Sequence, residues 1–97
     1  MRLRLLLTAV ESYSTQSMER RLAHRLLLLA VSHGVSTLQG PKIDLHLPQE
    51  TLAQLVESTR QRVNQILNTW EIDGIVQQEY GRILLLDKAR LEELARV

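Results

Sequence analysis

The residues best suited to chemistry lie within positions 58–70, and the chemistry they suit is hydrogen bonding to nucleic-acid bases. This stretch contains no Asp or Glu, although Glu57 and Glu71 lie directly on either side of it. The side chains that we expect to contact bases are Arg60, Gln61, Asn64 and Gln65. Arg forms paired hydrogen bonds with guanine, and Asn or Gln forms them with adenine. The stretch therefore predicts a helix that reads bases in a DNA major groove.

A solvated helix surface is the ordinary alternative for a polar face of this kind. Such surfaces usually mix Glu with Lys four residues apart, because the opposite charges stabilise the helix. The face in this sequence carries Arg and amides instead, and Asn68 continues the amide series at its far end. We therefore favour base recognition over simple solvation.

Two short helices joined by a tight turn are predicted around this face. Apolar residues recur at helical spacing on both sides of the turn, namely Leu52, Leu55 and Val56 before it and Val63, Ile66, Leu67 and Trp70 after it. Thr59 is a favourable N-cap for the second helix, which we expect over residues 59–72. This is the helix-turn-helix pattern, in which the second helix enters the major groove and recognises the DNA.

A β-hairpin is predicted directly after the helix-turn-helix. Residues 75–80 and 83–86 are strand-like segments on either side of Gly81. A hairpin in this place is a wing. The side chains that we expect to contact DNA phosphates are Thr59, Arg62 and, in the wing, Arg82. Asp87 is then expected to cap a last helix.

The segment before the helix-turn-helix is expected to supply a covering helix. Ser17 would cap this helix over residues 18–33, and its apolar run from Leu26 predicts cover on more than one side. Gly34 is expected to end it in a left-handed conformation. Residues 35–42 are expected to form a polar loop, followed by a short half-buried strand that contains Ile43, Leu45 and Leu47.

The composition fits one small domain from a reducing compartment. The chain has 97 residues, of which 44% are hydrophobic and only 3% aromatic, and this favours a modest, aliphatic, helix-rich core. The absence of Cys excludes disulfides and thiolate chemistry and agrees with a cytoplasmic location. Because the net charge is only +1, any affinity for DNA must come from locally placed Arg.

Residues 1–16 are expected to be the end of a dimerisation or linker helix. Apolar side chains recur there at helical spacing and would form a seam between two copies of the chain: Leu3, Leu6, Leu7 and Val10. A signal peptide is the alternative for a basic start followed by an apolar run. The run is too short to span a membrane and no clean cleavage site follows it, so we disfavour that alternative.

From about residue 18 onwards the chain resembles the C-terminal winged helix-turn-helix domain of the Crp/Fnr family of bacterial transcription regulators. The resemblance rests on the segments ERRLAHRLLLLA, IDLHLPQETLAQLVESTRQRVNQIL and GRILLLD. It implies a mainly α fold with a small β-hairpin wing (α+β) in residues 17–97, preceded by a dimerisation-type helix. It also implies a homodimer, which would bind a palindromic operator, and an upstream sensor domain. No cofactor is expected in this chain, and RNA polymerase is a further candidate partner beside double-stranded DNA.

Three positions depart from the family pattern. Glu57 stands in the turn where the family usually has Gly, which predicts a strained or rearranged backbone. Arg60 matches the family's guanine-reading arginine, but Gln61 replaces a common Glu and Gln65 replaces the second Arg of some members. Because amides at both places suit adenine, the family's operator sequence does not carry over to this chain.

Other classes of function have less support. An enzyme is disfavoured because the sequence has no Gly-rich phosphate loop and no recognisable nucleophile–base arrangement. His24 and His33 are not spaced as a ligand pair and have no carboxylate cluster beside them, so no metal site is expected. The main alternative is a winged-helix module that binds a protein without reading DNA. A protein-docking helix would more typically expose Leu, Tyr or Trp where this one has Arg, Gln and Asn.

Overall fold

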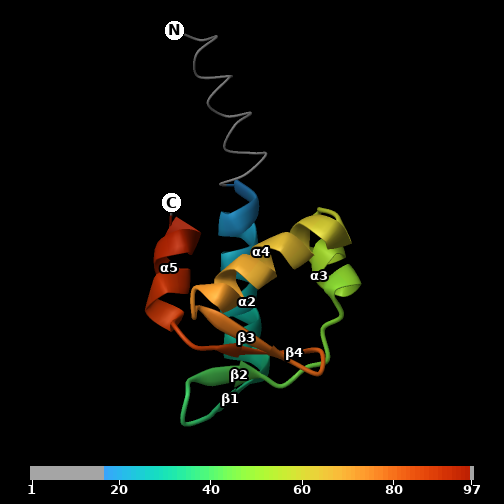
Figure 1. Ribbon diagram of the computed structural model, residues 1–97. Helices are drawn as coiled ribbons and strands as arrows, with labels where there is room; N and C mark the ends of the chain where they lie inside the picture. The colour runs from blue at the N-terminus through green and yellow to red at the C-terminus, as the bar shows by residue number, and fades with distance from the viewer. Residues whose placement is uncertain (1–16, 97) are drawn as a thin grey trace, which may run out of the picture.

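The computed structural model describes residues 17–96 (Figure 1). The predicted dimerisation helix, with its seam of Leu3, Leu6, Leu7 and Val10, lies outside the described residues. The described elements are, in chain order, α2 (Ser17–His33), β1 (Gly34–Ser36), β2 (Pro41–Ile43), α3 (Gln49–Leu55), α4 (Arg60–Ile72), β3 (Val76–Glu79), β4 (Arg82–Leu85) and α5 (Lys88–Arg96).

Helix α2 runs through the centre of the domain, and α5 packs along one side of it (Figure 1). Leu22 and Leu26 are four residues apart, so they lie on one face of α2, and both are fully buried together with Leu91 of α5. Burial of each such side chain contributes about 1.5–3 kcal/mol. Asp87 caps α5 as predicted, because its Oδ1 accepts a hydrogen bond from the Arg90 backbone N–H at 3.1 Å.

The strands form one antiparallel sheet of four strands in the order β1-β2-β4-β3. The predicted wing, β3 and β4, is therefore not a free hairpin, since Ile83 of β4 pairs with Ile43 of β2. The turn of the wing consists of Tyr80 and Gly81, with φ of 50° and 81°. Positive φ at both positions is typical of a type I′ turn, whose twist matches that of the flanking strands.

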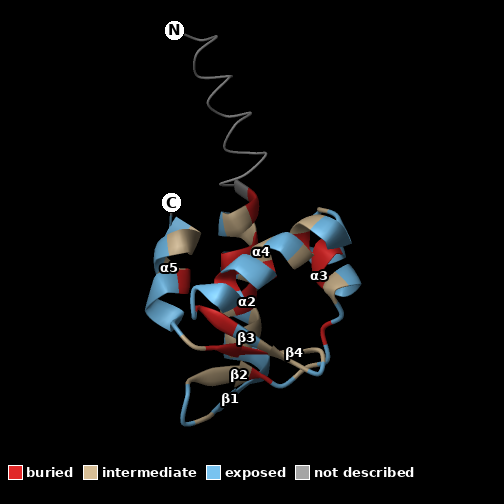
Figure 2. Ribbon diagram, viewed as in Figure 1, coloured by how far each residue is buried: buried red, intermediate tan, exposed pale blue. Residues whose placement is uncertain are grey.

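The core lies where α2, the sheet and the helix-turn-helix meet, as the buried segments in Figure 2 show. The largest fully buried side chains are Leu22, Leu26, Ile43, Leu52, Leu67, Leu85, Leu91, Val63 and Val76. All of these are aliphatic, as the composition predicts, and Trp70 joins them with 3% of its surface exposed. The helices with their small antiparallel sheet confirm the winged helix-turn-helix fold.

The prediction of a polar loop over residues 35–42 is wrong, because β1 and β2 form a hairpin there. Its turn is closed by Thr37, whose backbone N–H donates to the Gly40 carbonyl at 3.1 Å. The predicted strand ends at Ile43, and Leu45 and Leu47 lie beyond it in irregular chain. Strands of only three residues, here Gly-Val-Ser and Pro-Lys-Ile, are too short to show the alternation that a sequence pattern detects.

The prediction for the end of α2 is also wrong. Gly34 is not left-handed; it begins β1, and a Cβ there would lie 2.0 Å from the Ala30 carbonyl oxygen. Glycine therefore serves a close approach of the chain to the end of α2. The predicted cover of α2 on more than one side is confirmed, because α2 contacts both α5 and the strands β1 and β2, and Leu27, Leu29 and Ala30 pack against the core. Leu28 and Val31 of the same run are 48% and 84% exposed.

Candidate nucleic-acid interface

The turn between α3 and α4 contains a left-handed residue, and that residue is Glu57, with φ of 55°. Its backbone N–H donates to the Gln54 carbonyl at 3.3 Å, and the Ser58 N–H donates to the Ala53 carbonyl at 2.8 Å. These two bonds form the Schellman arrangement, which satisfies the carbonyls at the end of a helix. The prediction of a strained backbone at Glu57 is therefore confirmed, because side chains other than glycine rarely adopt this region.

Helix α4 begins and ends as its sequence predicts. The Thr59 Oγ1 accepts a hydrogen bond from the Arg62 backbone N–H at 3.1 Å, which is the predicted N-cap. Val63, Leu67 and Trp70 are buried, while Ala53 of α3 presents the small surface that allows the two helices to cross closely. After Ile72 the chain turns, and Gly74 has a φ of 74°. The other face of α4 is left available for contacts.

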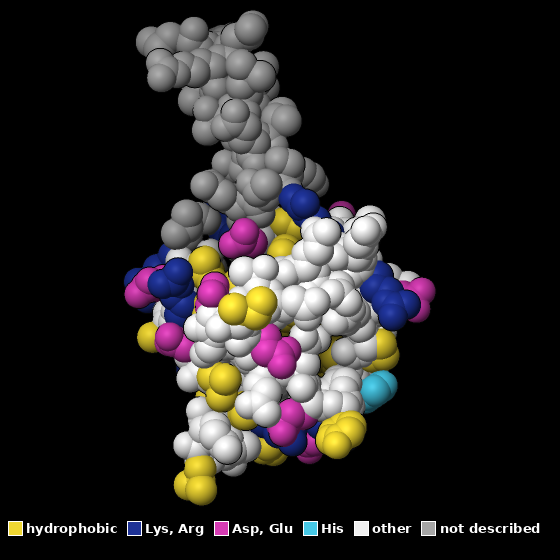
Figure 3. All heavy atoms as spheres, viewed as in Figure 1, with side chains coloured by type: hydrophobic (Ala, Val, Ile, Leu, Met, Phe, Trp, Pro, Cys, Tyr) yellow, Lys and Arg dark blue, Asp and Glu magenta, His cyan; other side chains and the backbone are white. Residues whose placement is uncertain are grey.

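The N-terminal part of that outer face is exposed. Arg60, Gln61 and Gln65 are all exposed, and so is the capping residue Thr59. Among residues 17–96, the side chains of Arg60 and Gln61 form no hydrogen bond or ion pair. Figure 3 shows many uncharged polar side chains on this face, with some Asp, Glu and hydrophobic side chains among them and Lys and Arg toward the edges. The surface thus offers polar groups rather than a broad positive field.

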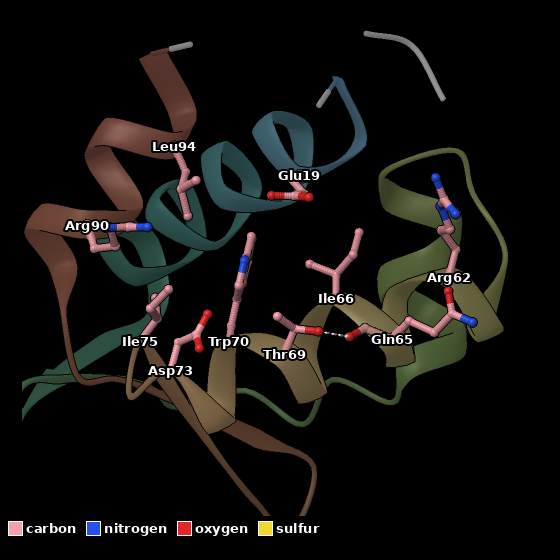
Figure 4. Close-up of a pocket in the computed structure, with 10 residues that line it drawn as sticks. All are labelled: Glu19, Arg62, Gln65, Ile66, Thr69, Trp70, Asp73, Ile75, Arg90 and Leu94. Atoms are coloured by element: carbon pink, nitrogen blue, oxygen red, sulfur yellow. Dashed lines mark hydrogen bonds between the residues drawn. The ribbon is translucent and has the colours of Figure 1, made fainter. Parts of the chain in front are cut away.

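Arg62 lies at one end of a groove of ≈ 270 Å³ between α4, α2 and α5 (Figure 4). The residues that line this groove are Glu19, Arg62, Gln65, Ile66, Thr69, Trp70, Asp73, Ile75, Arg90 and Leu94. Thr69 donates its hydroxyl hydrogen to the Gln65 carbonyl at 3.0 Å, as the dashed line shows. Arg62 is half-buried among these groove residues.

Asn64 belongs to a ring of side-chain amides that the sequence did not predict. Its Nδ2 donates to Gln49 Oε1 at 2.8 Å, and Gln49 Nε2 donates to Gln78 Oε1 at 3.0 Å. Gln78 Nε2 donates to Asn68 Oδ1 at 3.4 Å, and Asn68 Nδ2 closes the ring on Asn64 Oδ1 at 2.6 Å. We call this set the amide ring. It joins α3, α4 and the wing strand β3, and it brings in Gln49 and Gln78.

Arg82 of the wing does not project freely into solvent. Its Nε lies 3.2 Å from Asp44 Oδ1, and the two side chains are 41% and 58% exposed. A second ion pair joins Lys42 Nζ to Glu79 Oε1 at 3.6 Å. Because exposed pairs of this kind contribute only about 0–1 kcal/mol, Arg82 can exchange Asp44 for another anion at small cost.

Two histidines of α2 were considered as metal ligands. His24 and His33 are both exposed on α2, and His33 Nδ1 lies 2.9 Å from the Ser32 hydroxyl. Within residues 17–96, no group of His, Asp and Glu side chains is arranged to hold a metal ion. No helix in that part of the chain combines the length and the apolar character needed to cross a membrane.

Known proteins share this arrangement. The family model of the Crp-like helix-turn-helix domain matches residues 20–94. Transcriptional regulator SdrP from Thermus thermophilus is 33% identical over 86 residues, which cover 89% of this chain and 42% of that protein. Among solved structures, the CO-dependent transcription factor CooA from Carboxydothermus hydrogenoformans gives a TM-score of 0.79 at 31% identity, covering 96% of this chain and 43% of CooA.

A CRP-family transcriptional regulator, also from Thermus thermophilus, gives a TM-score of 0.75 at 27% identity, covering 98% of this chain and 50% of that one. The chain thus spans half or less of the length of these relatives. The matched segment extends from α2 into α5 and includes the helix-turn-helix and the wing. The chain belongs to the family of Crp-like helix-turn-helix domains, the DNA-binding domains of Crp/Fnr-type transcription regulators.

Proposed function

We propose that this domain binds a specific operator sequence and regulates transcription in the cytoplasm, with α4 lying in the major groove. The observation that carries the proposal is the outer face of α4, where Arg60 and Gln61 are exposed beside the capped helix start. Arg suits guanine, and the amides suit adenine. Membership of a family of transcription regulators supports the same conclusion.

The contacts divide into two kinds. The base contacts that we propose are Arg60, Gln61, Asn64 and Gln65. The phosphate contacts that we propose are Thr59, Arg62 and Arg82. Phosphate contacts fix the register of the protein on the duplex, whereas base contacts select the sequence. Since the net charge is only +1, these few placed groups must supply the attraction.

Selection of binding sites from random duplex DNA tests the proposal. We expect the wild-type chain to enrich one sequence, and Arg60→Ala to lose preference at one base pair of it. Arg96→Ala is the matched control, because it removes an exposed Arg on α5 and should leave the preferred sequence unchanged. A wild-type chain that enriches no sequence would overturn the proposal.

We further propose that the protein binds as a homodimer on a palindromic operator. The seam would consist of Leu3, Leu6, Leu7 and Val10, paired with the same residues of a second copy. Such pairing would set two recognition helices about 34 Å apart, which is one turn of duplex DNA. RNA polymerase is the further partner that we expect for a regulator of this kind.

A double substitution in the seam tests the dimer. Leu6→Asp with Val10→Asp should give a monomer that still folds but loses most of its operator affinity, because each half-site is then bound alone. Analytical ultracentrifugation and operator titration measure the two effects. A wild-type chain that stays monomeric at high concentration would contradict the seam.

A protein-interaction module without DNA readout is the second candidate function. The observation in its favour is exposed apolar surface: Val31 is 84% exposed on α2, and Leu38 is fully exposed in the β1–β2 turn. The same site selection separates the two functions, because an interaction module would enrich no DNA sequence. Ile72 at the end of α4 is also exposed, at 85%, so exposed apolar side chains occur on α2, on the β1–β2 hairpin and on α4.

A further inference from the structure

The hydrogen bonds of the amide ring all run in one sense, from donor to acceptor, and Glu71 determines that sense. An ionised carboxylate only accepts hydrogen bonds. Glu71 Oε1 accepts from Gln78 Nε2 at 2.9 Å, so the NH₂ group of Gln78 faces α4 and its carbonyl oxygen faces Gln49. Donation then runs one way round the ring, from Gln78 to Asn68, on to Asn64 and Gln49, and back to Gln78. One acceptor-only group therefore orients every amide in the ring.

Asn64 keeps hydrogen-bonding capacity outside the ring. A primary amide has two N–H donors and an oxygen with two acceptor sites. Asn64 uses one donor toward Gln49 and one acceptor site toward Asn68. It retains one donor and one acceptor site, which is the combination that adenine N7 and N6 require. Because two ring bonds hold the amide, Asn64 cannot exchange its nitrogen and oxygen positions without breaking both of them.

The ring also connects Asn64 to the wing. Gln78 lies on β3 and is half-buried, and its NH₂ group is directed at Asn68 and Glu71 of α4. Gln49 lies at the start of α3 and contributes both a donor and an acceptor to the ring. Removal of either side chain would open the ring and release the direction in which the Asn64 amide is held. The base preference of α4 would then depend on one residue of α3 and one residue of β3.

We propose that Gln49, Gln78 and Glu71 are positioning residues that fix the orientation of Asn64 for contact with one base. This inference rests on the proposed function, since it assumes that α4 lies in the major groove. The advantage of the ring is that an amide held before binding loses less conformational freedom in the complex than a mobile one. The wing thereby takes part in the choice of sequence through Gln78, without a base contact of its own.

Site selection with ring variants tests this inference. Asn64→Ala should lower discrimination at one base pair of each half-site by about tenfold. Gln78→Leu should lower discrimination at that same base pair by several-fold, with no further effect there when Asn64 is already Ala. Gln77→Leu is the matched control, because Gln77 is exposed on the same strand and points to its opposite face.

A second variant, Glu71→Gln, leaves all four amides of the ring in place but removes the acceptor-only group that orients them. Glu71→Gln can donate as well as accept, so the amides are no longer held in one sense. We expect discrimination at the Asn64 base pair to fall while the melting temperature changes little. Loss of the negative charge should raise the affinity for all DNA sequences together. The quantity to compare is therefore the ratio of affinities for operators that differ only at the Asn64 base pair. This variant serves as the test if Gln78→Leu does not fold.

The outcomes separate the inference from the proposed function. Ring variants that weaken all sequences equally, or that keep the preference at the Asn64 base pair, would show a purely structural ring and overturn the inference alone. An unchanged preference in Asn64→Ala would do the same. A wild-type chain that enriches no sequence would overturn the proposed function and the inference together.

Discussion

The two ends of the outer face of α4 are built differently. At its N-terminal end, Arg60 and Gln61 are exposed, and within residues 17–96 their side chains form no hydrogen bond or ion pair. On the side that faces the wing, Asn64 and Asn68 are tied into the amide ring. Polar side chains of similar chemistry thus form no bond to the described residues in one region, which we call the mobile end, and are tied to one another in the other.

The two ends differ in when their side chains lose conformational freedom, on binding DNA or already in the free protein. A mobile side chain loses about 0.5–1.5 kcal/mol of rotamer entropy when it is immobilised in a complex. The amides of the ring have lost that freedom in the free protein. For Arg60, this loss of entropy on binding is offset by its charge, because charge-assisted hydrogen bonds are roughly twice as strong as neutral ones. We therefore expect the strongest single contact at the mobile end and the most fixed orientation at the ring.

Among substitutions on α4, the largest expected effect is that of Arg60→Ala on operator binding. Loss of a bidentate contact to guanine should cost about 1–3 kcal/mol of discrimination at one symmetric base pair of each half-site. Titration of the selected operator and of a version changed at that base pair measures the loss. If Asn64→Ala costs more than Arg60→Ala, the ring rather than the mobile end carries the strongest contact, and the comparison is reversed.

A smaller effect is expected from Gln61→Glu, which tests how adaptable the mobile end is. Glutamate only accepts hydrogen bonds, so it suits the amino group of cytosine. We expect a changed preference at one position of the half-site, with the fold intact. Gln54→Glu adds the same charge at an exposed position of α3 and should weaken all sequences alike. Identical preferred sequences for Gln61→Glu and wild type would mean that Gln61 does not face the bases.

Local features of the helix-turn-helix were predictable because they depend on residues close in sequence. The cap at Thr59 joins atoms three residues apart, and the cap at Asp87 does the same. The strain at Glu57 was predictable because a single backbone position determines it. Buried apolar positions of α4 followed from helical spacing. Leu55 is the exception in α3, since it is 38% exposed despite its apolar spacing.

Features that join distant segments were not predictable. Gln49 and Gln78 are 29 positions apart, and Asp44 and Arg82 are 38 apart. Amides fit a solvated surface as readily as a ring, so residue type alone does not distinguish the two. The pairing of β2 with β4 was missed for the same reason. These short strands are far apart in the sequence, and their pairing depends on the fold that brings them together. The outward direction of Asn64 was predictable, whereas its partners were not.

A still smaller effect is expected at the wing, and it concerns affinity rather than sequence. Arg82→Ala should weaken all sequences by a few-fold and reduce the salt dependence of binding by about one phosphate contact. Asp44→Asn should have the opposite effect, because it releases Arg82 from its partner at 3.2 Å. Affinity measured over a series of salt concentrations tests both variants. A base-specific effect of Arg82→Ala would extend the ring's role in sequence choice to β4.

The smallest expected effect on DNA binding is that of Glu57→Gly, which relaxes the backbone at the mobile end without touching a base contact. The left-handed φ of 55° costs a residue with a Cβ about 1 kcal/mol, so the glycine variant should be more stable by roughly that amount. Gly74→Ala is the opposite substitution, at the other end of α4. A Cβ there has no neighbour within 4 Å, so we expect this variant to lose only the stability that a left-handed backbone costs a residue with a Cβ.

Chemical denaturation gives the stability of both variants, and site selection gives their base preferences. Glu57→Gln separates charge from backbone, since it removes the negative charge and keeps the Cβ. A rise in affinity that Glu57→Gln shares with Glu57→Gly is electrostatic. If Glu57→Gly alone alters the base preference at Arg60, then the strained turn positions the start of α4. The mobile end would in that case be held by its backbone, as the ring end is held by its side chains.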